Sequence, residues 1–224
     1  MSEESTSLNQ RELQRARRLG VSPSASLRRH FIALARQVCR WSNGRHDHRH
    51  AISIGVTSLE SKSGCSTISF NLAAALTSVA RDKVLLVESD FGKQFLSRRL
   101  GNSRTPGLAE LILGVAEMEE CLLNTPLANL SVLGSGRKSD QDAVELPFEQ
   151  LDHVMDEKLD HFGFAVFDLP VANHLTACFS IVPRLDGVIL AVDANQIEQK
   201  RIERFKKQLA DLGVEILGVV VNKS

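Results

Sequence analysis

The sequence predicts an α/β fold, a doubly wound and mostly parallel sheet covered by helices on both faces. From residue 51 onward, short and continuously apolar runs alternate with longer segments whose apolar residues recur at helical spacing. A strand that is apolar on both faces must be covered on both faces, as in parallel sheets built from βαβ units. The chain has 224 residues, 43% of them hydrophobic, which suffices for one such domain with a sizeable core.

Each element is predicted from its own local pattern. The apolar runs predict strands at 51–57, 83–89, 130–136 (a short strand that runs into a glycine loop), 164–168, 187–192 and 216–222. Helical periodicity predicts helices at 68–79, 107–113, 116–123, 147–159, 173–183 and 196–212. Ligands of such sheets bind at the carboxyl ends of the strands, so the residues that follow each strand are the candidates for a site.

A basic helical arm is predicted to precede the sheet. Residues 26–41 carry one apolar stripe at helical intervals, formed by Leu27, Phe31, Leu34 and Val38. We expect a mobile polar arm, an N-terminal helix and an α/β domain, at residues 1–25, 26–44 and 45–224. Residues 1–50 hold ten arginines, no lysine and four acidic residues, which leaves a net charge of −6 on the remainder. The basic region formed by residues 1–50 either docks on an acidic partner, a neighbouring subunit or an anionic membrane surface, or remains solvated.

The cysteines and the apolar runs indicate the cellular compartment, and the charged and aromatic residues indicate the class of partner. The four cysteines form no C-x-x-C pair, which indicates reduced thiols. No apolar run is long enough to span a membrane, and the N-terminus lacks the apolar segment of a signal peptide. We therefore expect a cytoplasmic protein, peripheral at the inner membrane if the arm binds lipid. Nucleic acid is the weakest partner hypothesis, because the arm lacks interleaved aromatic residues and the domain is not basic.

A phosphate-binding loop is predicted where strand 51–57 runs through SLESKSGCST (58–67) into a helix. In such a loop, backbone N–H groups and the helix N-terminus face the phosphate. The strict motif is G-x-x-x-x-G-K-[ST]. Gly64 and Ser66 match it, whereas Leu59 stands at the first glycine position and Cys65 at the lysine position.

Acidic residues are predicted at the ends of two neighbouring strands. KVLLVESDFGK (83–93) places Glu88 at the tip of one strand and Asp90 two residues later. FAVFDLP (164–170) places Asp168 at the tip of another, where a Walker B carboxylate stands, and VVVNK ends the last strand with Asn222. Together with the loop, these residues indicate a site for a nucleotide and Mg²⁺.

In this order the motifs resemble the cytoplasmic tyrosine kinases of bacterial capsule and exopolysaccharide systems, the CpsD/CapB-like kinases. Their relatives are the MinD/ParA ATPases, so the resemblance implies a P-loop NTPase fold. Seven stretches carry it, in order between residues 51 and 224: VTSLESKSGCSTISFNLA, KVLLVESDFGKQ, TPGLAELILG, NLSVLGSG, FGFAVFDLP, DGVILAV and LGVVVNK.

The resemblance implies roles for individual residues and implies ATP or ADP with Mg²⁺ as cofactors. Asp90 and Asp168 match catalytic carboxylates, and together with the Ser66 hydroxyl they match the Mg²⁺ ligands. Glu88 replaces the usual first aspartate of the second motif. The residues matched to nucleotide binding are Lys62, Ser63, Gly64, Cys65, Ser66, Thr67, Glu88 and Asn222, the last near the adenine-contact region.

Three departures from the family pattern weaken the predicted phosphate site. Cys65 replaces the phosphate lysine, and a neutral thiol cannot neutralise the β- and γ-phosphates. Glu60 replaces the signature lysine and is expected to repel phosphate, and Gly92 replaces an arginine. Lys62, which replaces a loop glycine, either swings in as a substitute cation, or points to solvent while its lost glycine distorts the loop.

Two further departures concern self-phosphorylation and assembly. The sequence contains no tyrosine, so we do not expect the chain to be its own tyrosine substrate as kinase members are. The family's N-terminal interface motif is matched by RHFIALA (29–35), which lacks its glutamate and arginines. The resemblance implies a membrane polysaccharide co-polymerase or a kinase-family subunit as partner, in a homo- or hetero-oligomer.

Histidines and one thiol supply the alternatives outside the family pattern. His46, His48 and His50 alternate in a polar loop and form either a metal site or a solvated run. His174 is interpreted as a packed residue at a helix start, although it follows Asp168 closely. Cys65 is interpreted as a simple replacement, although a helix N-terminus can lower a thiol pKa and make it reactive.

The function that this pattern favours is a regulatory or scaffold component of polysaccharide synthesis or export, with weak or no ATPase activity. One alternative is an active, divergent ATP-dependent tyrosine kinase or ATPase. Another is a MinD/ParA-like positioning ATPase that acts at a membrane. The pathway in all three rests on analogy of fold, whereas the chemistry rests on the site.

Overall fold

The structure, a computed structural model, confirms the predicted α/β class. It describes residues 25–44, 50–101, 106–136, 146–172, 175–195 and 198–223. The strands are β1 (Ile52–Ser58), β2 (Val84–Glu88), β3 (Leu122–Asn124), β4 (Leu130–Leu133), β5 (Phe164–Asp168), β6 (Gly187–Asp193) and β7 (Glu215–Asn222). The helices are α2 (Ala25–Ser42), α3 (Cys65–Ala80), α4 (Phe95–Arg99), α5 (Leu108–Ile112), α6 (Met118–Cys121), α7 (Gln150–Lys158), α8 (Leu175–Ile181) and α9 (Gln199–Asp211), with a 3₁₀ turn at Val182–Arg184.

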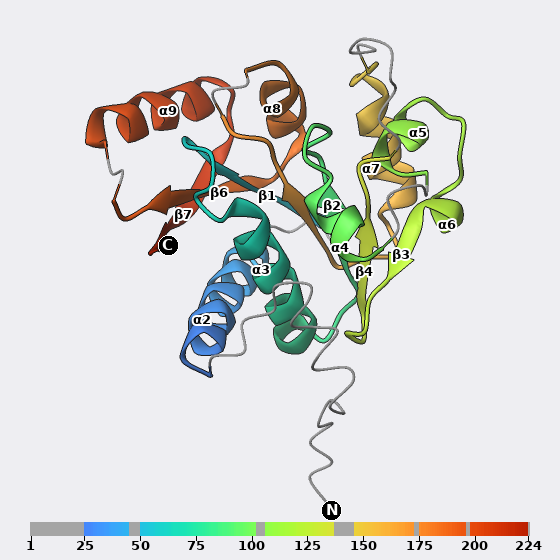
Figure 1. Cartoon of the computed structure of the whole chain (residues 1–224), viewed down its shortest axis with the longest axis horizontal. Helices are drawn as coiled ribbons and strands as arrows, with labels where there is room; N and C mark the ends of the chain where they lie inside the picture. The colour runs from blue at the N-terminus through green and yellow to red at the C-terminus, as the bar shows by residue number, and fades with distance from the viewer. Residues whose placement is uncertain are drawn as a thin grey trace, which may run out of the picture.

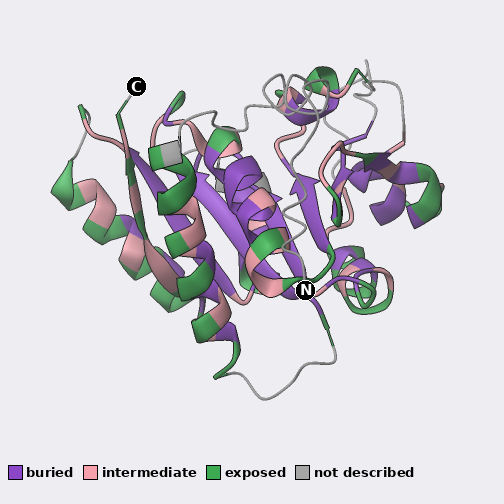
Figure 2. Cartoon of the chain, turned by 90° about the horizontal axis from the view of Figure 1, so that it is seen from below, coloured by how far each residue is buried: buried purple, intermediate pink, exposed green. Residues whose placement is uncertain are grey.

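The strands form one sheet in the order β3-β4-β2-β5-β1-β6-β7 (Figure 1). Neighbouring strands are parallel except β3, which runs antiparallel to β4. The three central strands β2, β5 and β1 are buried along their whole length, as Figure 2 shows. Their carboxyl ends therefore lie side by side at one edge of the sheet, where the predicted site belongs.

Two apolar layers cover the sheet, and strand β2 shows how they alternate. Val84 and Leu86 pack on the side of α2, α3 and α4, whereas Leu85 and Val87 pack on the side of α5 to α9. Successive side chains of a strand point to opposite faces, so a strand buried between two layers must be apolar throughout. This is the pattern from which the fold class was predicted.

The N-terminal helix belongs to this packing. α2 spans Ala25–Ser42 and buries Ala35 and Val38 in the same apolar layer as α3. Leu27, the first residue of the predicted stripe, is 50% exposed, because it lies a turn beyond the end of the contact. No helix in the described part of the chain is long and apolar enough to cross a membrane.

Two short elements were not predicted, and the helices expected at 116–123 and 147–159 are shorter than predicted. The second of these spans Gln150–Lys158. The helix expected at 116–123 ends at Cys121, and Leu122–Asn124 continue as β3, which pairs with the edge of β4. α4 was not predicted, because five residues carry too little periodicity to reveal a helix. α3 begins at Cys65, three residues before the predicted start. Ser66 and Thr67, which were predicted as residues of the phosphate loop, therefore belong to its first turn.

Candidate nucleotide-phosphate site

The loop between β1 and α3 is folded on itself by its own hydroxyl groups. The hydroxyls of Ser58 and Ser63 both donate to the carbonyl oxygen of Glu60, at 2.9 and 2.8 Å. Gly64, which precedes α3, has a φ of 81°, and its carbonyl accepts the N–H of Ile68 at 2.9 Å. The predicted strand–loop–helix geometry is therefore present, with the N-terminus of α3 at the end of the loop.

Asn222, from the end of β7, braces this loop. Its Nδ2 donates to the carbonyl oxygen of Ser63 at 3.2 Å. A Cβ atom at Gly64 would lie 2.5 Å from the same Nδ2, so glycine is required there by space as well as by backbone angle. The predicted contact of Asn222 with adenine stays a prediction, since the contact that the structure shows is with the loop.

Lys62 has a backbone conformation that glycine adopts readily and other residues do not. Its φ is 68°, in the left-handed region that an L side chain seldom adopts, and its side chain is exposed. The replacement of a glycine by Lys62 therefore strains the backbone of the loop. Of the two interpretations of the side chain, the structure shows the solvent-facing one.

Asp168 is the buried carboxylate at the centre of the site. It ends β5, is 1% exposed, and accepts a hydrogen bond from the hydroxyl of Ser69 at 3.1 Å. Burial raises its pKa to about 6, although the hydrogen bonds from Ser66, Ser69 and Cys65 lower it. Ser69 was not predicted as a site residue. Its place one turn after Cys65 on the same helix was the signal that could have revealed it.

The side chain of Cys65 turns onto the strand rather than toward the loop opening. Its Sγ donates to the carbonyl oxygen of Val56 at 3.0 Å, and the Leu169 carbonyl lies at 3.8 Å. Burial raises the thiol pKa well above its usual value, and the nearby charge of Asp168 adds to the rise. Burial and the carboxylate thus favour the neutral thiol of Cys65 over the alternative of a reactive thiolate at the helix N-terminus.

Glu88 is fully buried, and its carboxylate accepts hydrogen bonds from the neighbouring helix α4. Its Oε1 accepts the N–H of Leu96 at 2.6 Å, and its Oε2 accepts the Ser97 hydroxyl at 2.5 Å and the Ser135 N–H at 3.4 Å. The carboxylate thus binds the first amides of α4 and ties this helix to the loop after β4. These contacts use the extra methylene that distinguishes glutamate from aspartate. Contact of Glu88 with a nucleotide stays a prediction.

Asp90 lies in the turn after β2, partly exposed, and is paired with a cation that was not predicted. Its Oδ2 lies 2.8 Å from Nζ of Lys93, and its Oδ1 accepts the N–H of Gly92 at 3.2 Å. At Gly92, where the family has arginine, the chain offers this backbone N–H and no side-chain charge. Thr67 is exposed in the first turn of α3, as a residue that contacts phosphate must be.

The expected repulsion between Glu60 and phosphate is offset inside the protein. Nη1 of Arg201, on α9, pairs with Oε1 of Glu60, and Nη2 donates to the carbonyl oxygen of Leu59 at 3.3 Å. The negative charge is therefore compensated, and the loop is tied to α9. Arg201 lies 141 positions away in the sequence, so no local pattern could have revealed the pair.

The expected ligand is a nucleotide with Mg²⁺. The residues present fit Mg²⁺ and a phosphate at the start of α3 better than they fit the charge of the outer phosphates. The Ser66 hydroxyl and the carboxylates of Asp90 and Asp168 are oxygen donors of the kind that Mg²⁺ prefers. The amides at the start of α3 suit a phosphate. The neutral Cys65 does not fit the position of the lysine that neutralises the outer phosphates.

The other candidates lie apart from this site or outside the described residues. His50 is exposed, and His46, His48 and His174 are not among the residues described. Within the described segments, no cluster of three or more histidine, cysteine, aspartate or glutamate side chains is arranged to hold a metal ion.

Comparison with known proteins agrees with this geometry. No protein-family model matches the chain. The chain is 26% identical to the putative tyrosine-protein kinase CapB of Staphylococcus aureus over 171 residues, which are 76% of this chain and 75% of that protein. It is 28% identical to the tyrosine-protein kinase CpsD of Streptococcus pneumoniae serotype 4, with the same coverage of both chains.

Solved structures share the fold. The VpsO kinase domain superposes with a TM-score of 0.71 at 24% identity, over 89% of this chain and 97% of that one. The chimerical protein CapA2B2 superposes with a TM-score of 0.73 at 23% identity, over 95% and 99%. The septum site-determining protein MinD from Pyrococcus horikoshii, solved with Mg-ADP, superposes with a TM-score of 0.65 at 22% identity, over 77% and 70%.

The chain therefore has the fold of the P-loop NTPases of the MinD/ParA type. The proteins that it resembles in sequence include the CpsD/CapB-type bacterial tyrosine kinases. Both expectations from the sequence motifs are confirmed.

Proposed function

We propose that this protein is a regulatory or scaffold component of capsular or exopolysaccharide synthesis or export, which binds adenine nucleotide weakly and turns it over little or not at all. One observation carries the proposal. The phosphate-lysine position is held by the neutral thiol of Cys65, which is turned onto the Val56 carbonyl in a loop that is otherwise folded as a phosphate loop.

The chemistry left in the site supports binding more than catalysis. Phosphoryl transfer depends on positioning and on neutralising the charge that spreads over the outer phosphate oxygens. Amide groups of α3 and Mg²⁺ held by Ser66, Asp90 and Asp168 would neutralise part of that charge. The lysine of the loop and the arginine replaced by Gly92 would have supplied the rest.

A protein with little or no catalytic activity of its own would act by binding a partner. The solved relative CapA2B2 is a chimerical protein, and this supports a second component as the partner. We propose a membrane polysaccharide co-polymerase or an active kinase subunit as the partner of this chain. The arm at residues 1–25, which lies almost entirely outside the described residues, is a second proposed contact, with an anionic membrane surface.

The test of the proposal is calorimetry with Mg-ATP together with a phosphate-release assay. We expect weak binding and turnover far below that of CpsD-type kinases measured alongside. Turnover comparable with theirs, or phosphorylation of a tyrosine-containing acceptor peptide, would overturn the proposal and establish the second candidate, a divergent ATPase or kinase. That candidate is favoured by the presence of Ser66, Asp90 and Asp168, which lie at or after the carboxyl ends of the neighbouring strands β1, β2 and β5.

The arm is tested by liposome flotation. Removing residues 1–25 should weaken binding to vesicles that contain anionic lipid, and should leave the weak background on neutral vesicles unchanged. The positioning-ATPase alternative requires in addition that nucleotide change the fraction bound to the membrane. Equal flotation of the full chain and the truncated chain would mean that the arm is a solvated tail.

A further inference from the structure

The position of the phosphate lysine holds the neutral Cys65, and a neighbouring loop carries a lysine. Lys93 lies in the turn between β2 and α4, with its Nζ 2.8 Å from Oδ2 of Asp90. Its side chain is 54% exposed, whereas that of Asp90 is 16% exposed. An exposed ion pair of this kind is weak, so the ammonium can change partner at little cost.

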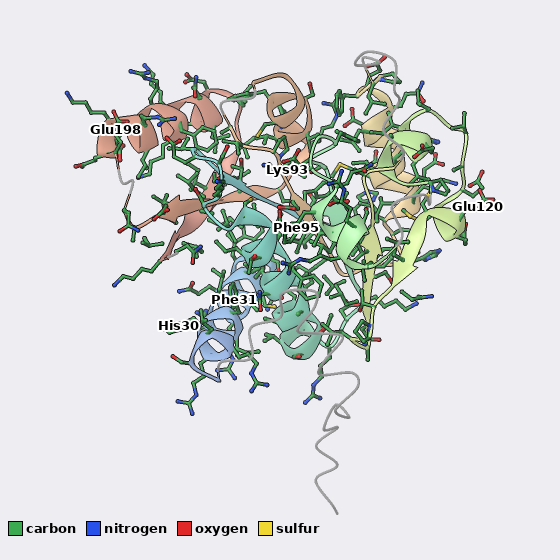
Figure 3. The ribbon with its side chains drawn as sticks, viewed as in Figure 1. His30, Phe31, Lys93, Phe95, Glu120 and Glu198 are labelled. Atoms are coloured by element: carbon green, nitrogen blue, oxygen red, sulfur yellow. The ribbon has the colours of Figure 1, made fainter. Side chains whose placement is uncertain are left out.

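The register of the central strands brings this turn beside the phosphate loop. β5 pairs with β2 and with β1, and Asp168 is the register partner of Glu88 on one side and of Val56 on the other. The turn after β2 and the loop after β1 therefore leave the sheet on either side of Asp168. In Figure 3, Lys93 lies beyond the carboxyl end of β2, in the turn that leads to α4.

The backbone at Lys93 is held by hydrogen bonds, while its side chain is exposed. The carbonyl oxygen of Asp90 accepts the N–H groups of Lys93 and Gln94, at 3.2 and 3.5 Å. Gln94 is buried, has a φ of 47°, and donates from Nε2 to the carbonyl oxygen of Gly136 at 2.6 Å. A buried amide thus anchors the turn to the loop after β4, and this fixes the point from which the Lys93 side chain reaches out.

The rival cation is Lys62, the substitute considered from the sequence. It lies in the β1–α3 loop itself, with an exposed side chain and a φ of 68° in the left-handed region.

We propose that Lys93 supplies the cation of this site, in place of the lysine that Cys65 replaces, for the phosphates of a nucleoside di- or triphosphate. In the free protein its ammonium is paired with Asp90. When phosphate oxygens approach the start of α3, the ammonium donates to them, and Asp90 becomes available to Mg²⁺. This inference rests on the proposed function, because it identifies what holds the weakly bound nucleotide.

The test measures ADP binding by calorimetry, with Mg²⁺ and again with EDTA. Lys93→Met should lower the affinity for ADP about tenfold to a hundredfold in both conditions, since one charge-assisted contact is lost. Lys206→Met is the matched control, because Lys206 also pairs with an acid three residues before it, Glu203, at 3.1 Å on α9. That control should leave the affinity unchanged, and thermal melts should show that both variants fold.

A double-mutant cycle separates Lys93 from a general effect of charge. In a Cys65→Lys background the restored lysine fills the same role, so Lys93→Met should cost well under tenfold. Lys62→Met tests the rival cation, and a loss as large as that of Lys93→Met would transfer the role to Lys62 and overturn the proposal.

The remaining outcomes also distinguish failure of the Lys93 proposal from failure of the proposed function. Unchanged affinity in Lys93→Met overturns the inference, as does a rise, which would show that Lys93 merely blocks Asp90. A wild-type protein that binds no ADP overturns the role of Lys93 and leaves the proposed scaffold function standing. High turnover in the wild type that falls with Lys93→Met would support Lys93 and overturn the scaffold function.

Discussion

The loops on the two sides of Asp168 have departed from the family pattern in opposite ways. The β1–α3 loop keeps its shape, with left-handed Lys62 and Gly64 and the brace from Asn222, but it has lost its lysine. The β2–α4 turn keeps its carboxylate Asp90 and carries a lysine of its own.

The difference teaches that loop shape and loop chemistry are separable. Backbone hydrogen bonds and packing maintain the shape of the β1–α3 loop, so it survives the loss of the side chain that served phosphate. The charge of a site, in contrast, can be supplied from any loop that reaches the same strand ends. The following predictions, ordered by the size of the expected effect, test this separation.

The largest effect is expected at the carboxylate that both loops share. Because burial raises the pKa of Asp168 from 3.8 to about 6, the folded state holds this proton more tightly than the unfolded state. Its contribution to stability is therefore greatest below pH 3.8, falls as the pH rises toward 6, and stays low above that. A shift of two pKa units corresponds to roughly 3 kcal/mol.

Asp168→Asn should accordingly raise the free energy of unfolding by about 1–3 kcal/mol at pH 7.5, and by much less at pH 4. It should also abolish any Mg²⁺-dependent part of nucleotide binding. Urea denaturation at the two pH values measures the first effect. Equal stabilisation at both would show that the carboxylate is not charged and buried at neutral pH.

The next effect is expected from restoring the chemistry of the β1–α3 loop. Cys65→Lys should raise the affinity for Mg-ADP about tenfold to a hundredfold, because a charge-assisted hydrogen bond contributes about 1.5–3 kcal/mol. Calorimetry measures it, and Cys65→Met serves as the uncharged control of similar length. No gain over that control would mean that the loop does not cradle phosphate, whatever its shape.

A smaller effect tests whether shape alone is held at Gly64. Gly64→Ala adds a Cβ atom 2.5 Å from Nδ2 of Asn222 at a φ of 81°, whereas Gly114→Ala adds one at a φ of 67° with no atom within 4 Å. Both variants introduce backbone strain, of about 1 kcal/mol. Only the first also displaces the brace, so it should lose about 1–2 kcal/mol more in chemical denaturation. Equal losses would mean that Asn222 does not support the loop.

The smallest effect concerns the tie between the β1–α3 loop and α9. Glu60→Gln removes the pair with Arg201, whose side chain is 37% exposed, so the free energy of unfolding should fall by less than about 1 kcal/mol. Hydrogen exchange should nevertheless become faster in residues 59–64, while β5 stays protected as the internal control. Unchanged exchange in the loop would show that other contacts hold it.

Much of this protein was predictable from the sequence, because strands, most helices and the phosphate loop leave local patterns. Continuous apolar runs predicted β1, β2, β5, β6 and β7 to within two residues of their ends. The strand-end positions of Asp90 and Asp168 followed from the same runs. The replacement of the lysine by Cys65 is likewise a property of the sequence alone.

Only the tertiary structure decided which groups meet. Glu88 looked like a ligand of the site by its position, but its carboxylate binds the first amides of α4, eight and nine residues further on. Glu60 looked repulsive until Arg201 was found beside it. Lys93 lies in the motif stretch KVLLVESDFGKQ, but only the fold shows that its ammonium pairs with Asp90, after the strand next to the one that ends at Asp168. Local patterns record which surfaces are buried, whereas charge compensation depends on neighbours that are distant in the sequence and adjacent only in the fold.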